Sequence, residues 1–340
     1  MRSAPLTTKI SFFMLSSDIE DGHGAPSPRF LGVSTPQNSS FEPMHNQRLK
    51  ASITLMIGGA FWGLLWIPLR AIEGVGVEKA WATLVVFAAP GALLIPLALY
   101  RWKIIATQLG TFLAVGLFCG VAFSLYGIAV LLTEVNRVIL LFYLTPLWGT
   151  IIGVIFLSER LTLQRVIALG LGFIGLLIVL DLGAKFPWPR NLGDWMAFIA
   201  GISWAMGSAV LFRSGGVKAV DQASSFIIGG SVCTLVLLAF AGGALGQVPT
   251  PDALVRAVPT GVIVALVIPP VLMMTIWPVT LLTPGRAGIL LMTEVIFGIG
   301  SAWLLANEIL GLRELIGAGL IMSATVLEVT AKDPNAPQPT

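Results

Sequence analysis

The chain has 340 residues, of which 56% are hydrophobic and only 11% charged, and its formal net charge is +3. A soluble domain carries about 25% charged residues, so this composition excludes an ordinary soluble core and predicts a membrane protein that contacts the lipid bilayer. The basic residues stand in short clusters between apolar runs, which is typical of topology signals. We therefore expect no nucleic-acid partner.

The first 47 residues differ from the rest of the chain. Segment 1–47 is rich in Ser, Pro, Gly and Asn, which predicts a disordered cytoplasmic N-terminal tail. Met44 stands just before the first apolar run, so an alternative start at Met44, with the earlier residues untranslated, is an equally good interpretation. Both histidines, His23 and His45, fall in this segment, which removes histidine-based metal sites and acid–base catalysis from the apolar part.

From Ala51 onward, long apolar runs alternate with short polar joints. A helix that crosses the hydrocarbon core needs about 20 mainly apolar residues, and ten runs meet this requirement. They are 51–70, 80–100, 108–130, 136–157, 164–181, 192–212, 222–245, 257–282, 286–306 and 311–331. We therefore expect an all-α membrane protein with ten transmembrane helices.

The basic residues of the joints predict the orientation. With ten spans both termini lie on one side, and more Lys and Arg residues fall on that side than on the other. Since basic joints stay on the cytoplasmic side, we expect a multi-pass protein of the inner (cytoplasmic) membrane with both termini in the cytoplasm.

The chain matches itself at an offset of 149 residues. Segment 136–173 aligns without a gap on 285–322, so that Arg137 matches Arg286. The shared pattern is an arginine that opens a helix, an apolar span, a Glu-x-Leu-x-Leu joint and a second helix with glycine. This self-similarity predicts an internal repeat.

Two repeats of five helices have a topological consequence. Because five is odd, the second repeat starts on the opposite side of the membrane, and the two repeats are inverted. Inverted repeats are typical of secondary transporters. We divide the chain into the tail 1–47, a first repeat 48–182, a second repeat 190–331 and a short cytoplasmic tail 332–340.

The repeated segments resemble a known family. LTPLWGTIIGVIFLSERLTLQRVIALGLGFIG in the first half and LMTEVIFGIGSAWLLANEILGLRELIGAGLIM in the second are similar to EamA-type members of the drug/metabolite transporter superfamily. The resemblance covers residues 50–330. It implies a cavity between the halves near mid-membrane, and it implies a small-molecule substrate, with export of amino acids and other small metabolites common among members. The tail before Met44 has no counterpart in it, and the second joint lacks the basic residue that follows Glu159.

Glu294 is the carboxylate predicted well inside a span. On the lipid face it would cost several kcal/mol, so it should face protein or water. Three interpretations stay open: a structural pair with Arg286 or another helix, a proton-coupling site, or a contact with a cationic group of the cargo. Replacing Glu294 with Gln and measuring transport against pH would test the coupling.

Aromatic residues also occur within the spans, although Trp and Tyr usually gather at membrane interfaces. Core packing and a cavity wall are equally good interpretations of each. The candidates for a substrate cavity are Trp62, Trp66, Tyr126, Asn136, Tyr143, Trp204, Trp277 and Glu294. Arg137 and Arg286 open equivalent helices on opposite sides; they either snorkel to headgroups or form gating charge pairs at the two mouths.

These features together favour a secondary transporter, an exporter of small metabolites such as amino acids or related amphipathic compounds, that works by alternating access. A multidrug efflux carrier and a membrane-embedded enzyme that acts on lipid-soluble substrates are the alternatives. The spans carry no acidic metal cluster, His–Glu motif or Ser/Lys dyad, so we expect no catalytic residues, metal or cofactor. The oligomeric state stays open, with a homodimer as one option.

Overall fold

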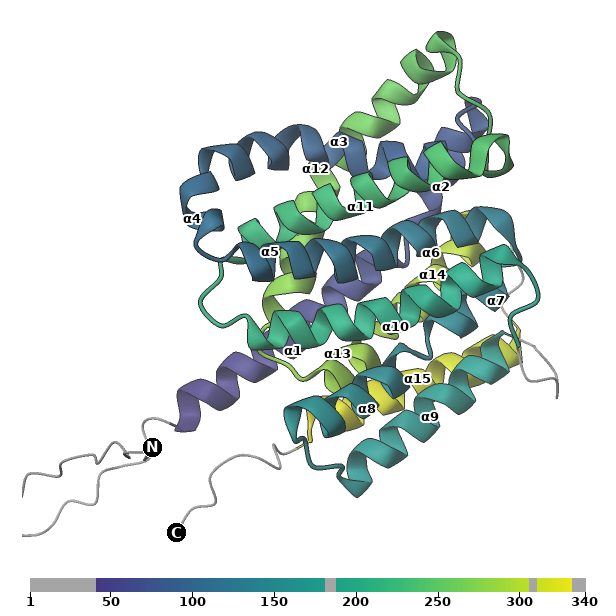
Figure 1. The fold of residues 1–340 in the computed structure, drawn as a ribbon. Helices are drawn as coiled ribbons and strands as arrows, with labels where there is room; N and C mark the ends of the chain where they lie inside the picture. Colours follow the sequence, from purple (N-terminus) through teal and green to yellow (C-terminus); the bar gives the residue numbers. More distant parts are fainter. Residues whose placement is uncertain (1–40, 181–187, 306–310, 332–340) are drawn as a thin grey trace, which may run out of the picture. The chain divides into compact units, whose positions relative to one another are not determined.

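The computed structural model describes residues 41–180, 188–305 and 311–331, and its regular structure within these ranges is helical throughout. Of the tail expected at 1–47, residues 1–40 lie outside the described part, and helix α1 begins at Phe41. The first half of the chain (Figure 1) contains α1 (Phe41–Trp62), α2 (Trp66–Gly74), α3 (Ala80–Tyr100), α4 (Trp102–Ala106), α5 (Leu109–Val115), the π-helix η1 (Gly116–Gly120), α6 (Val121–Leu132), α7 (Val135–Phe142), α8 (Thr145–Leu157) and α9 (Leu163–Val179).

The second half begins after residues 181–187, which lie outside the described part. It contains α10 (Leu192–Arg213), α11 (Ala219–Ala241), the 3-10 helix η2 (Gly242–Leu245), α12 (Pro251–Val279), α13 (Pro284–Leu291), α14 (Thr293–Leu305) and α15 (Leu312–Val329).

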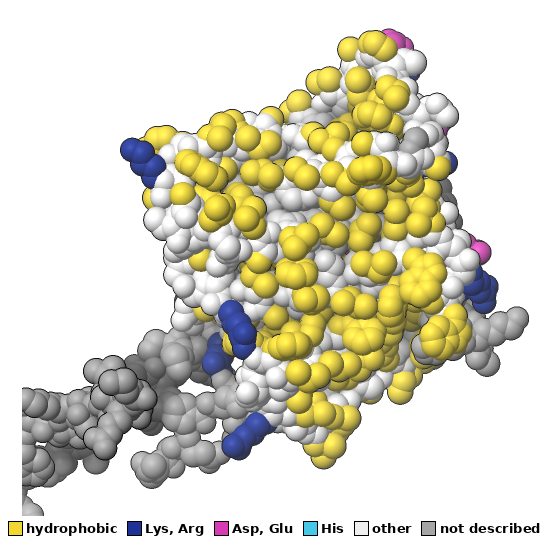
Figure 2. Space-filling model, in the orientation of Figure 1, with side chains coloured by type: hydrophobic (Ala, Val, Ile, Leu, Met, Phe, Trp, Pro, Cys, Tyr) yellow, Lys and Arg dark blue, Asp and Glu magenta, His cyan; other side chains and the backbone are white. Residues whose placement is uncertain are grey.

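Eight helical segments of the described residues are long and apolar enough to cross a membrane. They are Asn46–Gly74, Ala80–Tyr100, Leu109–Leu132, Arg137–Leu157, Leu192–Arg213, Ala219–Ala241, Pro251–Val279 and Pro284–Leu305. Helix α9 is apolar but shorter, and α15 is not among these candidates. Figure 2 shows hydrophobic side chains spread over the visible face, with Lys and Arg at its margins. Because such a surface suits hydrocarbon, these helices indicate a multi-pass membrane protein.

Three of these segments are interrupted near their middle. α1 and α2 are separated at residues 63–65, α7 and α8 at 143–144, and α13 and α14 at Met292. Pro146 falls in the first turn of α8, where a missing N–H disturbs no helical bond. By contrast, α12 continues through four internal prolines. The interruptions place helix ends, with their partial charges, in the interior of the bundle.

Successive helical segments run in alternating directions, with each interrupted segment counted as one, so the joints fall on two sides (Figure 1). We call the side where α1 begins and α15 ends the terminal side; its joints are 101–108, 158–162, 214–218 and 280–283. We call the opposite side the far side; its described joints include 75–79, 133–134 and 246–250.

The helix boundaries of the two halves agree with the offset found in the sequence. Moved by 149 residues, α7 falls on α13, and the first residue of α9 falls on the first residue of α15. The packing has the same relation. α9 packs on α15 and α3 on α11, while α10 packs on α6 and α8 as α1 packs on α12 and α14. Contacts between the halves therefore recur when the halves are exchanged.

An aromatic cluster centred on Phe123 of α6 fills the middle of the bundle. Its ring centroid lies 4.6 Å from that of Trp62, 5.1 Å from Trp204 and 5.2 Å from Phe226. All four side chains are buried. Rings at these distances and tilts pack favourably, and the cluster ties α1 and α6 to α10 and α11.

Candidate functional site

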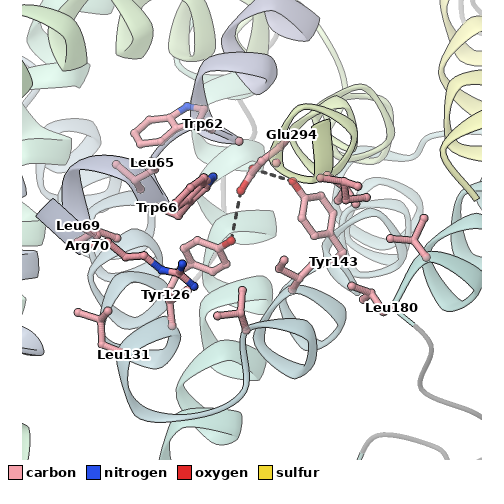
Figure 3. A pocket seen from close by; sticks show the side chains of 18 of the residues that line it. Trp62, Leu65, Trp66, Leu69, Arg70, Tyr126, Leu131, Tyr143, Leu180 and Glu294 are labelled. Atoms are coloured by element: carbon pink, nitrogen blue, oxygen red, sulfur yellow. Dashed lines mark hydrogen bonds between the residues drawn. The ribbon is translucent and has the colours of Figure 1, made fainter. Parts of the chain in front are cut away.

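A cavity of about 500 Å³ lies between the two halves of the chain (Figure 3). Its walls come from α2, α6, α7 and the end of α9 in the first half, and from α14 and the start of α15 in the second. It reaches Arg70 and Val135, which are exposed residues at the far side. The cavity therefore opens on the far side, and the aromatic cluster around Phe123 lies at its inner end.

Glu294 is the buried carboxylate of this cavity. It stands in the first turn of α14 and is 8% exposed. The Tyr143 hydroxyl donates to its Oε2 at 2.6 Å and the Tyr126 hydroxyl to its Oε1 at 3.3 Å (Figure 3, dashed lines). Two of the chain's three tyrosines thus hold one carboxylate. The partial positive charge of the α14 N-terminus adds to this stabilisation of the anion.

The structural pair of Glu294 with Arg286 that the sequence left open does not form. Arg286 is buried and donates through Nη2 to the Val329 carbonyl at 3.1 Å. Spacing along one helix suggested this pair, but the interruption at Met292 separates the two residues into different helices. The partners of Glu294 come instead from α6 and the end of α7. Because these helices are far from Glu294 in the sequence, its spacing could not indicate them.

Trp62 and Trp66 line the cavity on either side of the interruption between α1 and α2. The Trp62 Nε1 donates to Thr275 Oγ1 at 2.9 Å, and the Trp66 Nε1 donates to Ser301 Oγ at 3.0 Å. Both acceptors belong to the second half of the chain. The two indoles therefore bind α1 and α2 to α12 and α14, and they offer ring surface to the cavity rather than N–H groups.

The mouth of the cavity carries charges that the sequence analysis did not select. The Arg70 guanidinium lies over the Trp66 ring, 5.1 Å from its centroid. Two carboxylates also line the mouth: Glu73 accepts from the Lys79 backbone N–H at 3.2 Å, and Glu314 from that of Gly311 at 2.8 Å. The positions of Arg70 and Glu73, four and seven residues after Trp66, put them on its helix face. This helical spacing could have identified both residues from the sequence.

Three of the eight cavity candidates are not seen in this wall. Trp204 is 1% exposed and packs edge-on against Phe123 in the aromatic cluster. Trp277 lies on α12 with a side chain that is 37% exposed and does not line the cavity. The side chain of Asn136 lies outside the described part of the chain. The other five, Trp62, Trp66, Tyr126, Tyr143 and Glu294, line the cavity.

Arg137 and Arg286 are both buried, so neither snorkels to headgroups. Arg137 donates through Nη2 and Nε to Asp194 Oδ2, at 2.5 and 3.1 Å, and through Nη2 to the Trp188 carbonyl at 2.8 Å. These bonds join α7 to the start of α10 on the far side, beside the cavity rather than across it. Desolvation of a guanidinium is costly without such partners, which explains why each arginine is held by a neighbouring helix.

Ion pairs between helices close the terminal side. Arg165 at the start of α9 binds Glu159 at 2.5 Å and Glu328 of α15 at 3.1 Å, and all three are buried. Arg101 binds Asp221 of α11 through Nε at 2.5 Å and through Nη2 at 2.8 Å. The hydrogen bond to this carboxylate raises the pKa of the Arg101 guanidinium. Glu308, the repeat counterpart of Glu159, lies outside the described residues.

Backbone packing completes the closure of the terminal side. A Cβ added at Gly149 of α8 would lie 2.8 Å from the carbonyl of Pro284, and one at Gly288 of α13 would lie 2.8 Å from the Cα of Pro146. Only glycine allows helices to approach this closely. α8 and α13 are thus in contact where a passage to the terminal side would have to run.

Comparisons with known proteins give a family and a fold. Residues 49–181 match the sequence model of the EamA-like transporter family. Among curated proteins none matches the chain in sequence. A crystal structure described only as that of a protein is similar with a TM-score of 0.60 at 17% sequence identity, over 83% of this chain and 96% of the other; at this identity the likeness concerns the fold. Residues 49–181 therefore belong to the EamA-like transporter family of the drug/metabolite transporter superfamily, which confirms the resemblance seen in the sequence for this part of the chain.

Proposed function

We propose that this protein is a secondary transporter that exports small metabolites, amino acids or related amphipathic compounds, across the cytoplasmic membrane. The observation that carries the proposal is one cavity of about 500 Å³ whose wall is built by both halves and that reaches exposed residues on the far side. A volume of this size accommodates a small organic molecule. The family over residues 49–181 supports transport as the activity.

We propose alternating access through two inverted five-helix repeats as the mechanism. The helix boundaries that recur at an offset of 149, and the contacts that recur on exchange of the halves, support the repeats. Inverted halves can exchange conformations and so open the cavity to either side. In this state the far side is open, and the terminal side is closed by the Arg165 and Arg101 ion pairs. With both termini in the cytoplasm, as the basic joints favour, this is an outward-open state.

The test is metabolite profiling of spent medium from deletion, overexpressing and complemented strains. We expect one or a few amine- or carboxylate-bearing metabolites to accumulate with overexpression of the native chain. A chain with Glu294→Gln, confirmed to be in the membrane, should restore that accumulation only in part. Identical profiles in all strains over many growth conditions would refute export.

Proton coupling at Glu294 is part of the same proposal. The titratable groups that face this carboxylate are the phenols of Tyr126 and Tyr143, and the cavity wall adds Arg70, Glu73 and Glu314 at its mouth. A carboxyl that alternates between a buried and a wetted state can carry a proton in exchange for cargo. Transport by the native chain should then depend on pH and that of Glu294→Gln should not; an unchanged profile removes coupling at this residue.

A further inference from the structure

We propose that the inner end of the cavity recognises a protonated amine, so that the cargo enters with an ammonium group toward Glu294. This inference rests on the proposed function, because it names the chemical class that the same cavity takes. It follows from an account of the hydrogen-bond donors, acceptors and charges that line the wall.

The side-chain hydrogen-bond donors of the inner wall already have acceptors within the protein. The indole N–H groups of Trp62 and Trp66 donate to Thr275 and Ser301, and both tyrosine hydroxyls donate to Glu294. Of the described lining side chains, the donors left to a cargo are Arg70 and the Trp303 indole, both exposed side chains at the mouth.

By contrast, the Glu294 carboxylate in the inner wall can still accept hydrogen bonds. An ionised carboxylate offers about four lone-pair positions, and the two phenols occupy two of those on Glu294. The bond from Tyr126 is long, at 3.3 Å, so Oε1 is the more available oxygen. Since a carbonyl or carboxylate of the cargo would meet no free side-chain donor among the described residues there, the group favoured at this end is itself a donor. An ammonium supplies three N–H donors and no acceptor.

The charges of the wall agree with this requirement. The described lining residues that carry charge are Glu73, Glu294, Glu314 and Arg70, an excess of acid. The two arginines within the spans that might have held an anion are engaged elsewhere, Arg137 with Asp194 and Arg286 with the Val329 carbonyl. An anionic group at the inner end would therefore face a carboxylate without a compensating cation.

The aromatic rings supply the remaining contacts. Trp62, Trp66, Tyr126 and Tyr143 surround the approach to Glu294 in Figure 3. A cation over such rings is attracted by the ring quadrupole. The same rings accept an apolar body, so the favoured cargo combines an ammonium with a hydrocarbon or aromatic group. A carboxylate on the cargo is tolerated only toward the mouth, where Arg70 is held over Trp66.

The experiment uses three probes with one apolar body: phenethylamine, 3-phenylpropionate and L-phenylalanine. Their affinity for the full-length protein in nanodiscs is measured at pH 7 by equilibrium binding of the radiolabelled compounds. We expect phenethylamine to bind and 3-phenylpropionate to bind at least about 10-fold more weakly, the size of one lost charge-assisted bond. Tighter or equal binding of 3-phenylpropionate, or no binding of phenethylamine, would overturn the inference.

Variants assign the binding to the cavity. Glu294→Gln should weaken phenethylamine binding about 10-fold or more, whereas Glu294→Asp, which keeps the charge, should retain the preference for the cation. Arg70→Gln should weaken the binding of L-phenylalanine relative to that of phenethylamine, and the exposed Asp252→Asn is the matched control for loss of a carboxylate. Unchanged phenethylamine binding in a folded Glu294→Gln would refute the role of this residue. Export seen in spent medium together with anion-selective binding would refute this inference alone and leave the proposed function standing.

Discussion

Replacing Glu328 with Gln should make the cavity accessible from the terminal side. Glu328 is fully buried, and its Oε1 accepts from Arg165 Nη2 at 3.1 Å, which joins α15 to α9. Glutamine keeps the shape and one oxygen but loses the charge. Because Arg165 retains Glu159, the loss is less than the 3–5 kcal/mol of a fully broken buried pair, and about 1.5–3 kcal/mol is appropriate for one charged hydrogen bond.

This free energy determines how much the population of the state open on the terminal side should rise. If the bond is lost whenever the terminal side opens, its removal raises the population of that minor state about 10- to 150-fold. The cavity residue Val130, changed to Cys in a chain whose Cys119 and Cys233 are replaced by Ala, is the reporter. Its rate of modification by a membrane-impermeant thiol reagent, added only to the terminal side of proteoliposomes, is proportional to that population. The exposed Glu134→Gln is the control. An unchanged rate in Glu328→Gln, or an equal rise in the control, would refute the reasoning.

Three further predictions concern packing and the second ion pair. Gly63→Ala should destabilise the protein by about 1–3 kcal/mol in thermal unfolding, because the added Cβ meets the backbone of α14, whereas Gly74→Ala, with no atom within 4 Å, should not. Trp66→Phe keeps a ring but removes the hydrogen bond to α14; it should cost about 1 kcal/mol, and an unchanged unfolding temperature would contradict this. Asp221→Asn should raise labelling from the terminal side as Glu328→Gln does, while Asp252→Asn, in a pair within one helix, should leave it unchanged.

The membrane class and the helices could be predicted from the sequence because they depend on long runs of apolar residues. Periodicity and length do not depend on distant contacts, so the expected spans fall close to the described helices. Two of the expected spans, α9 and α15, are too short or too polar to count among the candidates by length and composition. The interruptions at 63–65, 143–144 and Met292 were not predicted, since an apolar run does not reveal where its helix breaks.

The candidate site was predictable only in part. An acidic residue inside a span must find partners, which singled out Glu294, and the aromatic residues within spans gave Tyr126 and Tyr143 separately. That both hydroxyls donate to this carboxylate depends on the packing of α6, α7 and α14, which one sequence does not encode in its spacing. For the same reason Trp204 could not be told from a cavity residue, because a ring in a core and a ring in a wall have the same sequence signature.

The two halves correspond in backbone more closely than in chemistry. At the offset of 149 residues, the place of Glu294 is taken in the first half by Thr145, and the pair of Arg165 and Glu328 corresponds to Glu314 and Val179, which line the open mouth. A carrier with identical halves would have two end states of equal energy and would dwell in each for half its time. Under the proposed alternating access, one end state of this protein has an ion pair for which the other has no equivalent. In that proposed mechanism the empty protein should therefore rest with its far side open, and each cycle should draw the free energy of leaving that state from the cargo or from the proton proposed to bind at Glu294.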